Sequence, residues 1–351
     1  MVMSSSQASK QDQWGAVILV GLKAITSIRC MMWTALGVAS FLAPVSPARA
    51  QVGSDRYSSI VVDAGSGTVL SGVNTDELRH PASLAKIMTA YMLFEALREG
   101  RLSFDQPVPV SAHAAAQQPS KLGLLPGTVI TVEQALLGLV TKSANDAAAA
   151  LGELMGGDEG RFAQMMTLQA RSLGMVQTTF RNASGLPDPD QVTTARDLAL
   201  LARHLVQDYP MYYPYFSTPG FAWHGRMIPN NDTMLLTYPG ADGIKAGYIA
   251  TAGHNLVTSA VCAGMRLVGV VLGAASSRER DRQMTALLDQ GFERMDVLPP
   301  ARVASTHLPW VVSTVHAAAM PRVVGPVLRA VSAATALRHG LVRNRLASRR
   351  G

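Results

Sequence analysis

The stretch 81-PASLAKIMTA-90 places Ser83 and Lys86 three residues apart at the start of an apolar run with helical periodicity. Leu84, Ile87 and Met88 follow the 3.6-residue repeat of a helix with a buried face. Taken alone, the polar pair has an ordinary interpretation, in which Ser83 caps the helix and Lys86 is a solvated charge. The other motifs of the chain decide between this interpretation and a chemical one.

The same pair suits nucleophilic catalysis. A serine hydroxyl is a weak nucleophile and needs a nearby base that takes its proton during attack. Residues three apart share a helix face, so the Lys86 amine is expected one turn from the Ser83 hydroxyl. The helix N-terminus also favours developing negative charge. A free lysine has a pKa of about 10.4, so burial or a second cation has to lower the pKa of Lys86 before it can act as a base.

Strand-like segments flank a largely helical middle region. Residues 57–63 (YSSIVVD) and 68–72 (TVLSG) are joined by a Gly-Ser-Gly turn and predict a β-hairpin. Helical patterns occupy 83–98, 158–174 and 193–206, and two capping boxes are predicted, Thr131 with Gln134 and Ser276 with Glu279. The β-rich stretches are 243–249, 254–261 and 266–273. This order predicts one sheet built from both ends of the domain.

Two further polar motifs lie downstream. In 141-TKSANDAAAA-150, Ser143 and Asn145 interrupt a continuous helical pattern, and at such a break both side chains can point into a cleft. There a hydroxyl can relay a proton and an amide can hold a substrate amide. In 242-DGIKAGYI-249, Lys245 supplies a second cation on a predicted strand whose backbone can pair with an extended peptide.

The order of these motifs is more specific than any one of them. S-x-x-K, S-x-N and K-x-G follow one another at separations of 60 and 102 residues, on a predicted helix, a helix break and a strand. This is the motif order of penicillin-binding proteins and β-lactamases. From about Tyr57 to Phe292 the chain resembles the exported D-alanyl-D-alanine carboxypeptidases, which are low-molecular-mass penicillin-binding proteins. The stretches PSKLGLLPG, NASGLPD and YPGADGIKAGY extend the resemblance.

The resemblance implies a fold and an activity. The fold class is α/β (α+β) of the β-lactamase/transpeptidase type, with an antiparallel sheet formed by both ends of the domain, flanking helices and a mainly helical lobe. The activity is that of a serine-type D-Ala-D-Ala carboxypeptidase, which removes the terminal D-alanine from peptidoglycan stem peptides through an acyl-enzyme. β-Lactam antibiotics are then expected to be covalent inhibitors.

The resemblance also assigns roles to seven residues. It implies that Ser83 is the nucleophile, Lys86 its general base and Ser143 a third catalytic residue. The implied substrate-binding residues are Asn145, Lys245, Gly247 and Tyr248. In the family, backbone N–H groups at the positions of Ser83 and Tyr248 form the oxyanion hole, which stabilises the developing negative charge.

The chain departs from the family pattern at two places. The third motif usually reads K-T-G, and its threonine hydroxyl helps hold the terminal carboxylate of the substrate, but here the position is Ala246. A hydrogen bond to a charged group contributes about 1.5–3 kcal/mol, so we expect activity to fall by about one to two orders of magnitude and to survive. Asn230, Asn231 and Asp232 stand where the family often has N-x-N, which leaves the role of the second asparagine open.

Three functions follow from this pattern. The first is the carboxypeptidase. The second uses the same chemistry, as an endopeptidase that cleaves cross-links or as a β-lactamase, although no residue can be identified as the deacylating carboxylate of class A β-lactamases. The third is a catalytically weakened cell-wall-binding protein, suggested by Ala246. The intact motif residues Ser83, Lys86, Ser143 and Lys245 argue against this third function.

Three regions are predicted along the chain: a signal peptide at 1–50, the catalytic domain at 51–296 and a basic tail at 297–351. Arg29 precedes an apolar run at 31–45, and Ala48 and Ala50 suit cleavage before Gln51. A transmembrane anchor is the alternative, but a span needs about 20 apolar residues. The pattern predicts export to the periplasm, with peripheral attachment to the inner membrane as a further expectation.

Composition excludes several other classes of protein. The formal net charge is +7, but aromatic residues make up only 6% of the chain and no basic patch interleaved with aromatics is visible, so no nucleic-acid partner is expected. There is no metal-binding spacing such as H-E-x-x-H, no G-x-G-x-x-G motif and no P-loop. The sequence therefore predicts neither a metal nor a cofactor.

The predicted tail at 297–351 contains eight arginines and no Asp or Glu. A basic amphipathic helix of this kind is typical of binding to an anionic membrane surface, and a disordered basic tail is the alternative.

Deleting residues 318–351 tests the membrane interpretation. We expect the full chain to sediment with anionic lipid vesicles at low salt, because its arginines are attracted to the lipid headgroups, and the truncated chain to stay in the supernatant. Neutral vesicles and high salt are the controls. A full chain that does not bind anionic vesicles at low salt would contradict the prediction.

Overall fold

The computed structural model of the chain describes residues 54–300. The predicted signal peptide at 1–50 and nearly all of the predicted tail at 297–351 lie outside the described residues, and both stay predictions. Within residues 54–300, no helix combines the length and apolar character needed to cross a membrane.

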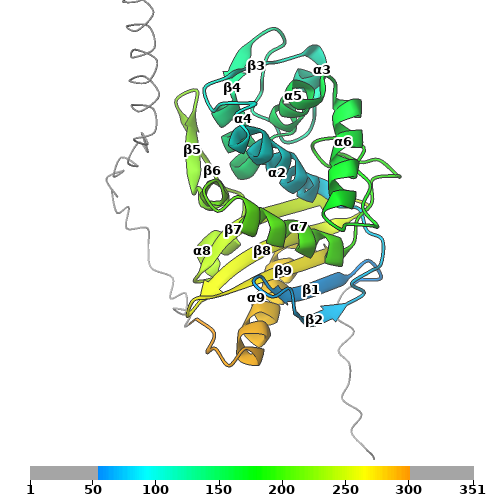
Figure 1. Ribbon diagram of the computed structural model, residues 1–351, viewed down its shortest axis with the longest axis vertical. Helices are drawn as coiled ribbons and strands as arrows, with labels where there is room; N and C mark the ends of the chain where they lie inside the picture. Colours follow the sequence, from blue (N-terminus) through cyan, green and yellow to red (C-terminus); the bar gives the residue numbers. More distant parts are fainter. Residues whose placement is uncertain (1–53, 301–351) are drawn as a thin grey trace, which may run out of the picture. The chain divides into compact units, whose positions relative to one another are not determined.

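A five-stranded antiparallel sheet joins the two ends of the described chain (Figure 1). In spatial order the strands are β2 (Val69–Val73), β1 (Ser58–Asp63), β9 (Met265–Ala274), β8 (Gly253–Cys262) and β7 (Ala241–Ile249). Pairing of β1 with β9 brings the two ends of the domain together, which confirms the predicted sheet. Among the described strands β7 has a neighbour on one side only, so its other edge can pair with an extended chain.

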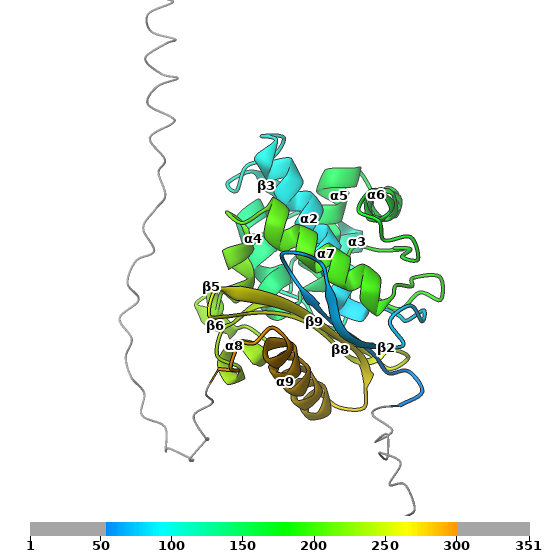
Figure 2. The same cartoon turned by 60° about the horizontal axis from the view of Figure 1, so that its bottom comes forward.

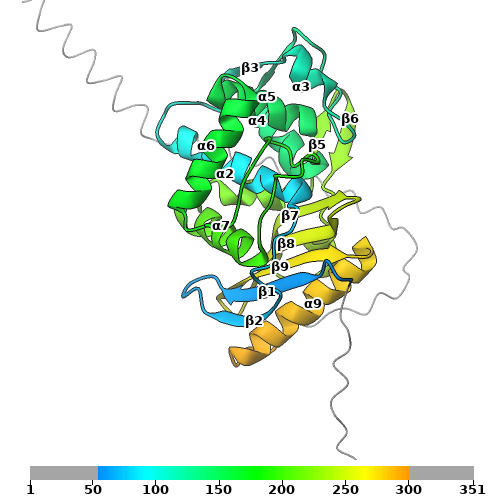
Figure 3. The same cartoon turned by 90° about the vertical axis from the view of Figure 1, so that its right-hand side faces the viewer.

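Helices occupy the middle of the sequence and form a lobe on one face of the sheet (Figures 1 and 3). The longer ones are α2 (Ala85–Arg98), α5 (Asn145–Gly156), α6 (Glu159–Ser172) and α7 (Ala195–Asp208). Shorter helical elements are η1 (Ala82–Leu84), α3 (Ala112–Ala116), α4 (Val132–Leu137), η2 (Gly138–Lys142), η3 (Tyr213–Ser217) and α8 (Met234–Thr237). Two small hairpins complete the described chain, β3 (Pro107–Pro109) with β4 (Val129–Thr131) and β5 (Gly220–Trp223) with β6 (Arg226–Pro229).

The other face of the sheet is covered by α9 (Ser277–Arg294), as Figures 2 and 3 show. Met284, Leu288 and Phe292 of α9 are fully buried at the helical spacing of four residues and pack in an apolar cluster with residues of β1, β8 and β9. Burying each such side chain contributes about 1.5–3 kcal/mol to folding. The sheet is therefore held between two apolar layers.

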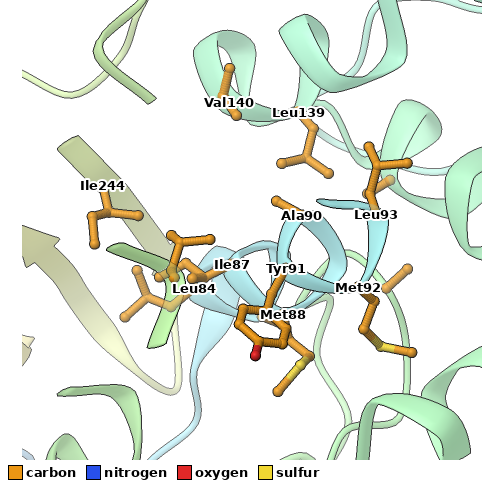
Figure 4. Packing of buried hydrophobic residues seen from close by; sticks show 14 of the residues in the cluster. Leu84, Ile87, Met88, Ala90, Tyr91, Met92, Leu93, Leu139, Val140 and Ile244 are labelled. Carbon is orange, nitrogen blue, oxygen red and sulfur yellow. The ribbon is translucent and has the colours of Figure 1, made fainter. Parts of the chain in front are cut away.

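Side chains beside the three sequence motifs belong to one buried cluster, the main core (Figure 4). Leu84 and Ile87 adjoin the first motif, Val140 lies three residues before Ser143, and Ile244 precedes Lys245; all four belong to one buried cluster. Because packed interiors leave little room for adjustment, this cluster fixes the relative positions of η1, η2 and β7.

The predicted helix starts are confirmed in part. Thr131 and Gln134 form the expected capping box at α4. Ser276 accepts a hydrogen bond from the Glu279 backbone N–H at 3.1 Å, but the Glu279 carboxylate accepts from the Ala275 N–H instead of closing the box. At 83–98 the chain begins with the 3-10 turn η1, and α2 starts only at Ala85, with no side-chain cap. The ordinary interpretation of Ser83 as a helix cap is therefore wrong.

Candidate active site

Lys86 is the most deeply enclosed of the predicted catalytic residues, with no solvent exposure. Its Nζ lies 2.6 Å from Asn145 Oδ1, 2.6 Å from the Ser184 carbonyl oxygen and 3.2 Å from Ser83 Oγ. A neutral amine has two N–H donors and one lone pair. When the two short contacts take both donors, the lone pair remains for the Ser83 hydroxyl.

The surroundings of Lys86 favour this neutral state. Burial, followed by the nearby charge of Lys245, holds the pKa of Lys86 well below its usual value, while Glu159 and Asp146 act in the opposite direction. Desolvation disfavours the charged form because a buried ammonium loses its hydration. The lysine interpreted from sequence as a base with a lowered pKa is thus placed where burial lowers it.

The second motif occupies the break between η2 and α5. Ser143 adopts a left-handed backbone conformation, with φ 60° and ψ 37°, and α5 begins two residues later at Asn145. The Asn145 Nδ2 donates to the Gln118 carbonyl at 2.7 Å, which leaves Oδ1 facing Lys86. Both ends of the amide are therefore engaged within the protein, and in this structure Asn145 orients the Lys86 amine.

The Ser143 hydroxyl, unlike the Asn145 amide, is buried without a hydrogen-bond partner among the described residues. The side chain is 5% exposed. Leaving a buried hydroxyl unpaired costs roughly 1–3 kcal/mol, and the left-handed backbone at a non-glycine residue adds strain. An unpaired buried hydroxyl and a strained backbone are typical of residues in functional sites. Both features agree with the predicted role of Ser143 as a proton relay.

The third motif lies on β7, an edge strand of the five-stranded sheet. Lys245 is 1% exposed, and its Nζ donates to the Ala246 carbonyl at 2.9 Å. Burial lowers the pKa of Lys245 to about 8, with Asp232 acting to raise it and Arg280 to lower it further. With a pKa of about 8, Lys245 keeps its positive charge at neutral pH.

Gly247 allows β7 to approach the nucleophile closely. A Cβ atom at this position would lie 2.9 Å from the Ser83 backbone nitrogen and 3.3 Å from that of Leu84. Both contacts are to backbone, which cannot move aside as a flexible side chain can. Tyr248, one residue further along, is 57% exposed and its ring contacts that of His254 in a tilted arrangement, with ring centroids 4.4 Å apart. The structure thus brings the start of the first motif against the third, and the oxyanion role of the Ser83 and Tyr248 N–H groups stays a prediction.

One part of the site was missed by the sequence analysis, namely the loop around Ser184. Its carbonyl contacts Lys86, and the side chain of Asn182 shapes the loop by accepting from the Gly185 N–H at 2.7 Å and the Leu186 N–H at 3.0 Å. Gly185 has φ +84°, and a Cβ there would collide with the Ala82 carbonyl oxygen. The stretch NASGLPD was noticed as part of the resemblance, and the Asn-x-x-Gly turn within it is the signal that could have located the loop.

Asp146 was also missed. It is fully buried, and its carboxylate accepts hydrogen bonds from the backbone N–H groups of Leu122, Gly123 and Leu124 at 2.9–3.1 Å. The neighbouring residues Gln118 and Ser120 contribute carbonyl oxygens to Asn145. Asp146 therefore holds the loop that in turn fixes the second motif.

These features agree with comparisons to known proteins. A family model described as D-alanyl-D-alanine carboxypeptidase matches residues 45–276, about two thirds of the chain. The chain belongs to this peptidase family, S11. The family predicted from the motif order is thereby confirmed.

Individual relatives of this chain are named as D-alanyl-D-alanine carboxypeptidases. The chain is 33% identical over 253 residues to D-alanyl-D-alanine carboxypeptidase DacF of Bacillus subtilis, a match that covers 70% of this chain and 64% of the relative. It is 36% identical over 259 residues to DacC of Escherichia coli, covering 72% and 65%. The matched part thus spans slightly less than two thirds of these curated relatives.

Solved structures of penicillin-binding proteins share the fold. Penicillin binding protein 5 from Haemophilus influenzae matches with a TM-score of 0.65 and 33% identity, covering 67% of this chain and 70% of that chain. Penicillin-Binding Protein D2 from Listeria monocytogenes in the cefotaxime-bound form matches with a TM-score of 0.59 and 30% identity, covering 67% and 96%. The predicted fold class is confirmed.

Replacing Lys86 by arginine tests its role as the base. We expect Lys86→Arg to lower the rate of covalent labelling by a fluorescent penicillin by about 10²–10⁴-fold. The reason is that a guanidinium stays protonated over the whole pH range of the assay and cannot accept the proton of Ser83. In the wild type the labelling rate should rise with pH as Lys86 loses its proton, and the lowered pKa places this rise below the usual range of lysine.

Lys142→Arg is the matched control, because it makes the same substitution at an exposed lysine at the end of η2. It should keep the wild-type rate and pH profile. Thermal melting establishes that both variants are folded. A Lys86→Arg protein that is acylated at nearly the wild-type rate would show that another group takes the proton.

Proposed function

We propose that this chain is a serine-type D-Ala-D-Ala carboxypeptidase, which removes the terminal D-alanine from peptidoglycan stem peptides through an acyl-enzyme. The observation that carries the proposal is the buried Lys86 amine, whose two short contacts to Asn145 and Ser184 leave its lone pair for Ser83. Membership of the S11 family and the carboxypeptidase names of the relatives support the choice of reaction.

Substrate binding is expected along β7. The free edge of this strand can pair with the backbone of an extended peptide, which would place the scissile carbonyl beside the Ser83 backbone. Lys245 supplies a buried positive charge on the same strand, suited to the terminal carboxylate of the substrate. A free carboxyl end is therefore the feature that the site selects.

The reaction follows in two stages. The Ser83 hydroxyl gives its proton to Lys86 while Oγ attacks the carbonyl carbon of the penultimate D-alanine, and the oxyanion is stabilised by backbone N–H groups. The proton then passes from Lys86, with Ser143 Oγ as relay, to the nitrogen of the leaving D-alanine, and the C–N bond breaks. In the second stage, water adds to the ester, Lys86 takes its proton, and the bond to Ser83 Oγ breaks as the hydroxyl regains a proton.

β-Lactams are proposed as covalent inhibitors at the same serine. The Listeria monocytogenes protein that this chain resembles is described in cefotaxime-bound and ampicillin-bound forms. A β-lactam carries an activated amide and a carboxylate, so it offers Ser83 and Lys245 the same two groups as the peptide.

Export to the periplasm is proposed as the setting of this activity. The supporting features are the apolar run at 31–45 after Arg29 and the small residues before Gln51. Attachment of the arginine-rich tail to an anionic membrane surface would keep the enzyme near the inner membrane, where stem peptides are within reach.

Replacing Ser83 tests the nucleophile. We expect Ser83→Ala to take up no labelled penicillin and to release no D-alanine from a D-Ala-D-Ala peptide, because no hydroxyl remains to form the ester. The matched control is Ser172→Ala at the exposed end of α6, which should behave as the wild type. Equal labelling of Ser83→Ala and wild type would contradict the assignment.

Ala246→Thr tests the departure in the third motif. Ala246 pairs with Leu256 and belongs to the apolar cluster on the α9 side of the sheet. A threonine could keep its methyl in this cluster and present its hydroxyl at the strand edge. We expect kcat/KM for a D-Ala-D-Ala peptide to rise about tenfold, equivalent to about 1.4 kcal/mol.

The control substrate is the same peptide with its terminal carboxylate amidated, for which the gain should vanish. A neutral or harmful effect on the free acid would mean that the enzyme holds the carboxylate through other residues. Ala246 would then be part of a rebuilt site and not a weakened one.

A further inference from the structure

Four buried or partly buried charged residues include Lys245, the residue proposed to bind the substrate carboxylate. Lys245 on β7 is 1% exposed, Asp232 in the segment between β6 and α8 is 3% exposed, and Arg280 on α9 is 4% exposed. Asp281, the fourth, has a side chain that is 22% exposed. The four charges sum to zero, which is the condition under which buried ions are tolerated.

The Arg280 guanidinium is already paired. Its Nε and Nη2 donate to Asp281 Oδ1 at 2.8 and 2.7 Å. The other Asp281 oxygen accepts from Thr233 Oγ1 at 2.6 Å, which links α9 to the segment that carries Asp232. Asp232 and Lys245 are the two remaining opposite charges of this cluster; they form no direct salt bridge and interact through the buried interior between them.

The carboxylate of Asp232 is held by one oxygen only. Oδ1 accepts from the Met234 backbone N–H at 3.0 Å, and the Asp232 backbone N–H donates to Asn230 Oδ1 at 2.9 Å. Oδ2 is buried and has no hydrogen-bond partner among residues 54–300. A buried carboxylate oxygen without a donor is unfavourable unless a positive charge compensates it.

We propose that Asp232 is a positioning residue for Lys245, and that its second carboxylate oxygen is the counter-charge that keeps the buried ammonium charged for the terminal carboxylate of the substrate. This inference rests on the proposed function for its consequence in catalysis. The electrostatic coupling of Asp232 and Lys245 is independent of that function.

The titration properties of the pair agree with the geometry. Burial raises the pKa of Asp232 to about 6, against the opposing effects of Lys245 and Arg280. Burial lowers the pKa of Lys245 to about 8, and Asp232 limits this decrease. Between these values Asp232 is negative and Lys245 positive.

Removing the negative charge of Asp232 should change the pKa of Lys245 in one direction. Lys245 would then be left with the cation Arg280 of α9 in its surroundings, and the only remaining acidic group of the cluster would be Asp281, which is paired with Arg280. The pKa of Lys245 must fall further, because its charged form loses a favourable interaction. The enzyme should lose its carboxylate-binding charge at a lower pH.

Asp232→Asn tests the proposal, since the amide keeps the shape of the side chain and an oxygen for the Met234 N–H. We expect the alkaline limb of the pH profile, measured as the rate of penicillin labelling and as kcat/KM for D-alanine release, to move to lower pH by about one unit. Asp105→Asn, at an exposed loop residue, is the control and should leave the profile in place. An Asp232→Asn protein with lower activity but an unmoved alkaline limb would overturn the proposal, because a structural role changes amplitude alone.

A second measurement follows Lys245 directly in the full chain. The sequence contains only six lysines, so 13C labelling of lysine gives few Cε signals, and Lys245→Arg identifies the one that belongs to Lys245. In the wild type this signal should show its own titration together with a smaller inflection near pH 6, from the ionisation of Asp232. In Asp232→Asn the inflection should disappear and the main midpoint should fall.

The two experiments separate the two claims. A wild type that neither labels with penicillin nor releases D-alanine would contradict the proposed function, while the lysine titration would still test the pair. A wild-type Lys245 signal without the Asp232 inflection would overturn the pair even in an active enzyme, and this result does not depend on whether Asp232→Asn folds.

Discussion

The burial of the Lys86 amine is the constraint on which the rest of the site depends. A lysine at the surface would hold its proton and could not act on Ser83, whereas complete burial favours the neutral form. Burial alone would leave a polar group without partners, which is unfavourable. Asn145 and the Ser184 carbonyl remove this difficulty by accepting the two amine protons at 2.6 Å. The geometry that stabilises the neutral amine is therefore the same geometry that directs it toward the serine.

The core supplies the rigidity that such geometry needs. Leu84, Val140 and Ile244 lie within three residues of the motif residues Ser83, Ser143 and Lys245, and they pack in one cluster. The motifs are separated by 60 and 102 residues in sequence, so no local interaction could keep them together. Gly247 and Gly185 then remove the side chains that would prevent close approach to the backbone at residues 82–84. Small errors in position weaken catalysis strongly, which is why packing and glycine placement matter at this site.

Features with a local pattern were predicted well from the sequence. The hairpin of β1 and β2, the helix predicted at 83–98 and the Thr131 capping box depend on residues within one or two turns, and the structure confirms them, with α2 starting at Ala85. The motif residues were recognised because their side-chain chemistry is unusual for their positions. Interactions that depend on the fold were not predicted. The carbonyl of Ser184 could not be predicted, because every residue has a carbonyl, and the helical periodicity from residue 83 gave no sign of the 3-10 turn that precedes α2.

The two lysines of the site require opposite protonation states in nearly the same environment. Both are almost completely buried, and desolvation lowers the pKa of each. The partners differ. Lys86 is contacted by a neutral amide and a neutral carbonyl, which accept hydrogen bonds but add no charge. The Asp146 and Glu159 carboxylates, which act on Lys86 from further away, accept from backbone N–H groups at Leu122 and Ala183.

Lys245, by contrast, interacts with the carboxylate of Asp232, whose Oδ2 accepts no hydrogen bond from the described residues. A charged Lys245 also helps to keep Lys86 neutral, because protonation of Lys86 would bring two like charges close together. Replacing the counter-charge at position 232 would weaken this difference, because a neutral Lys245 no longer lowers the pKa of Lys86. The base and the carboxylate-binding cation are thus one coupled system, in which Asp232 favours the charged form of Lys245 and, through that charge, the neutral form of Lys86.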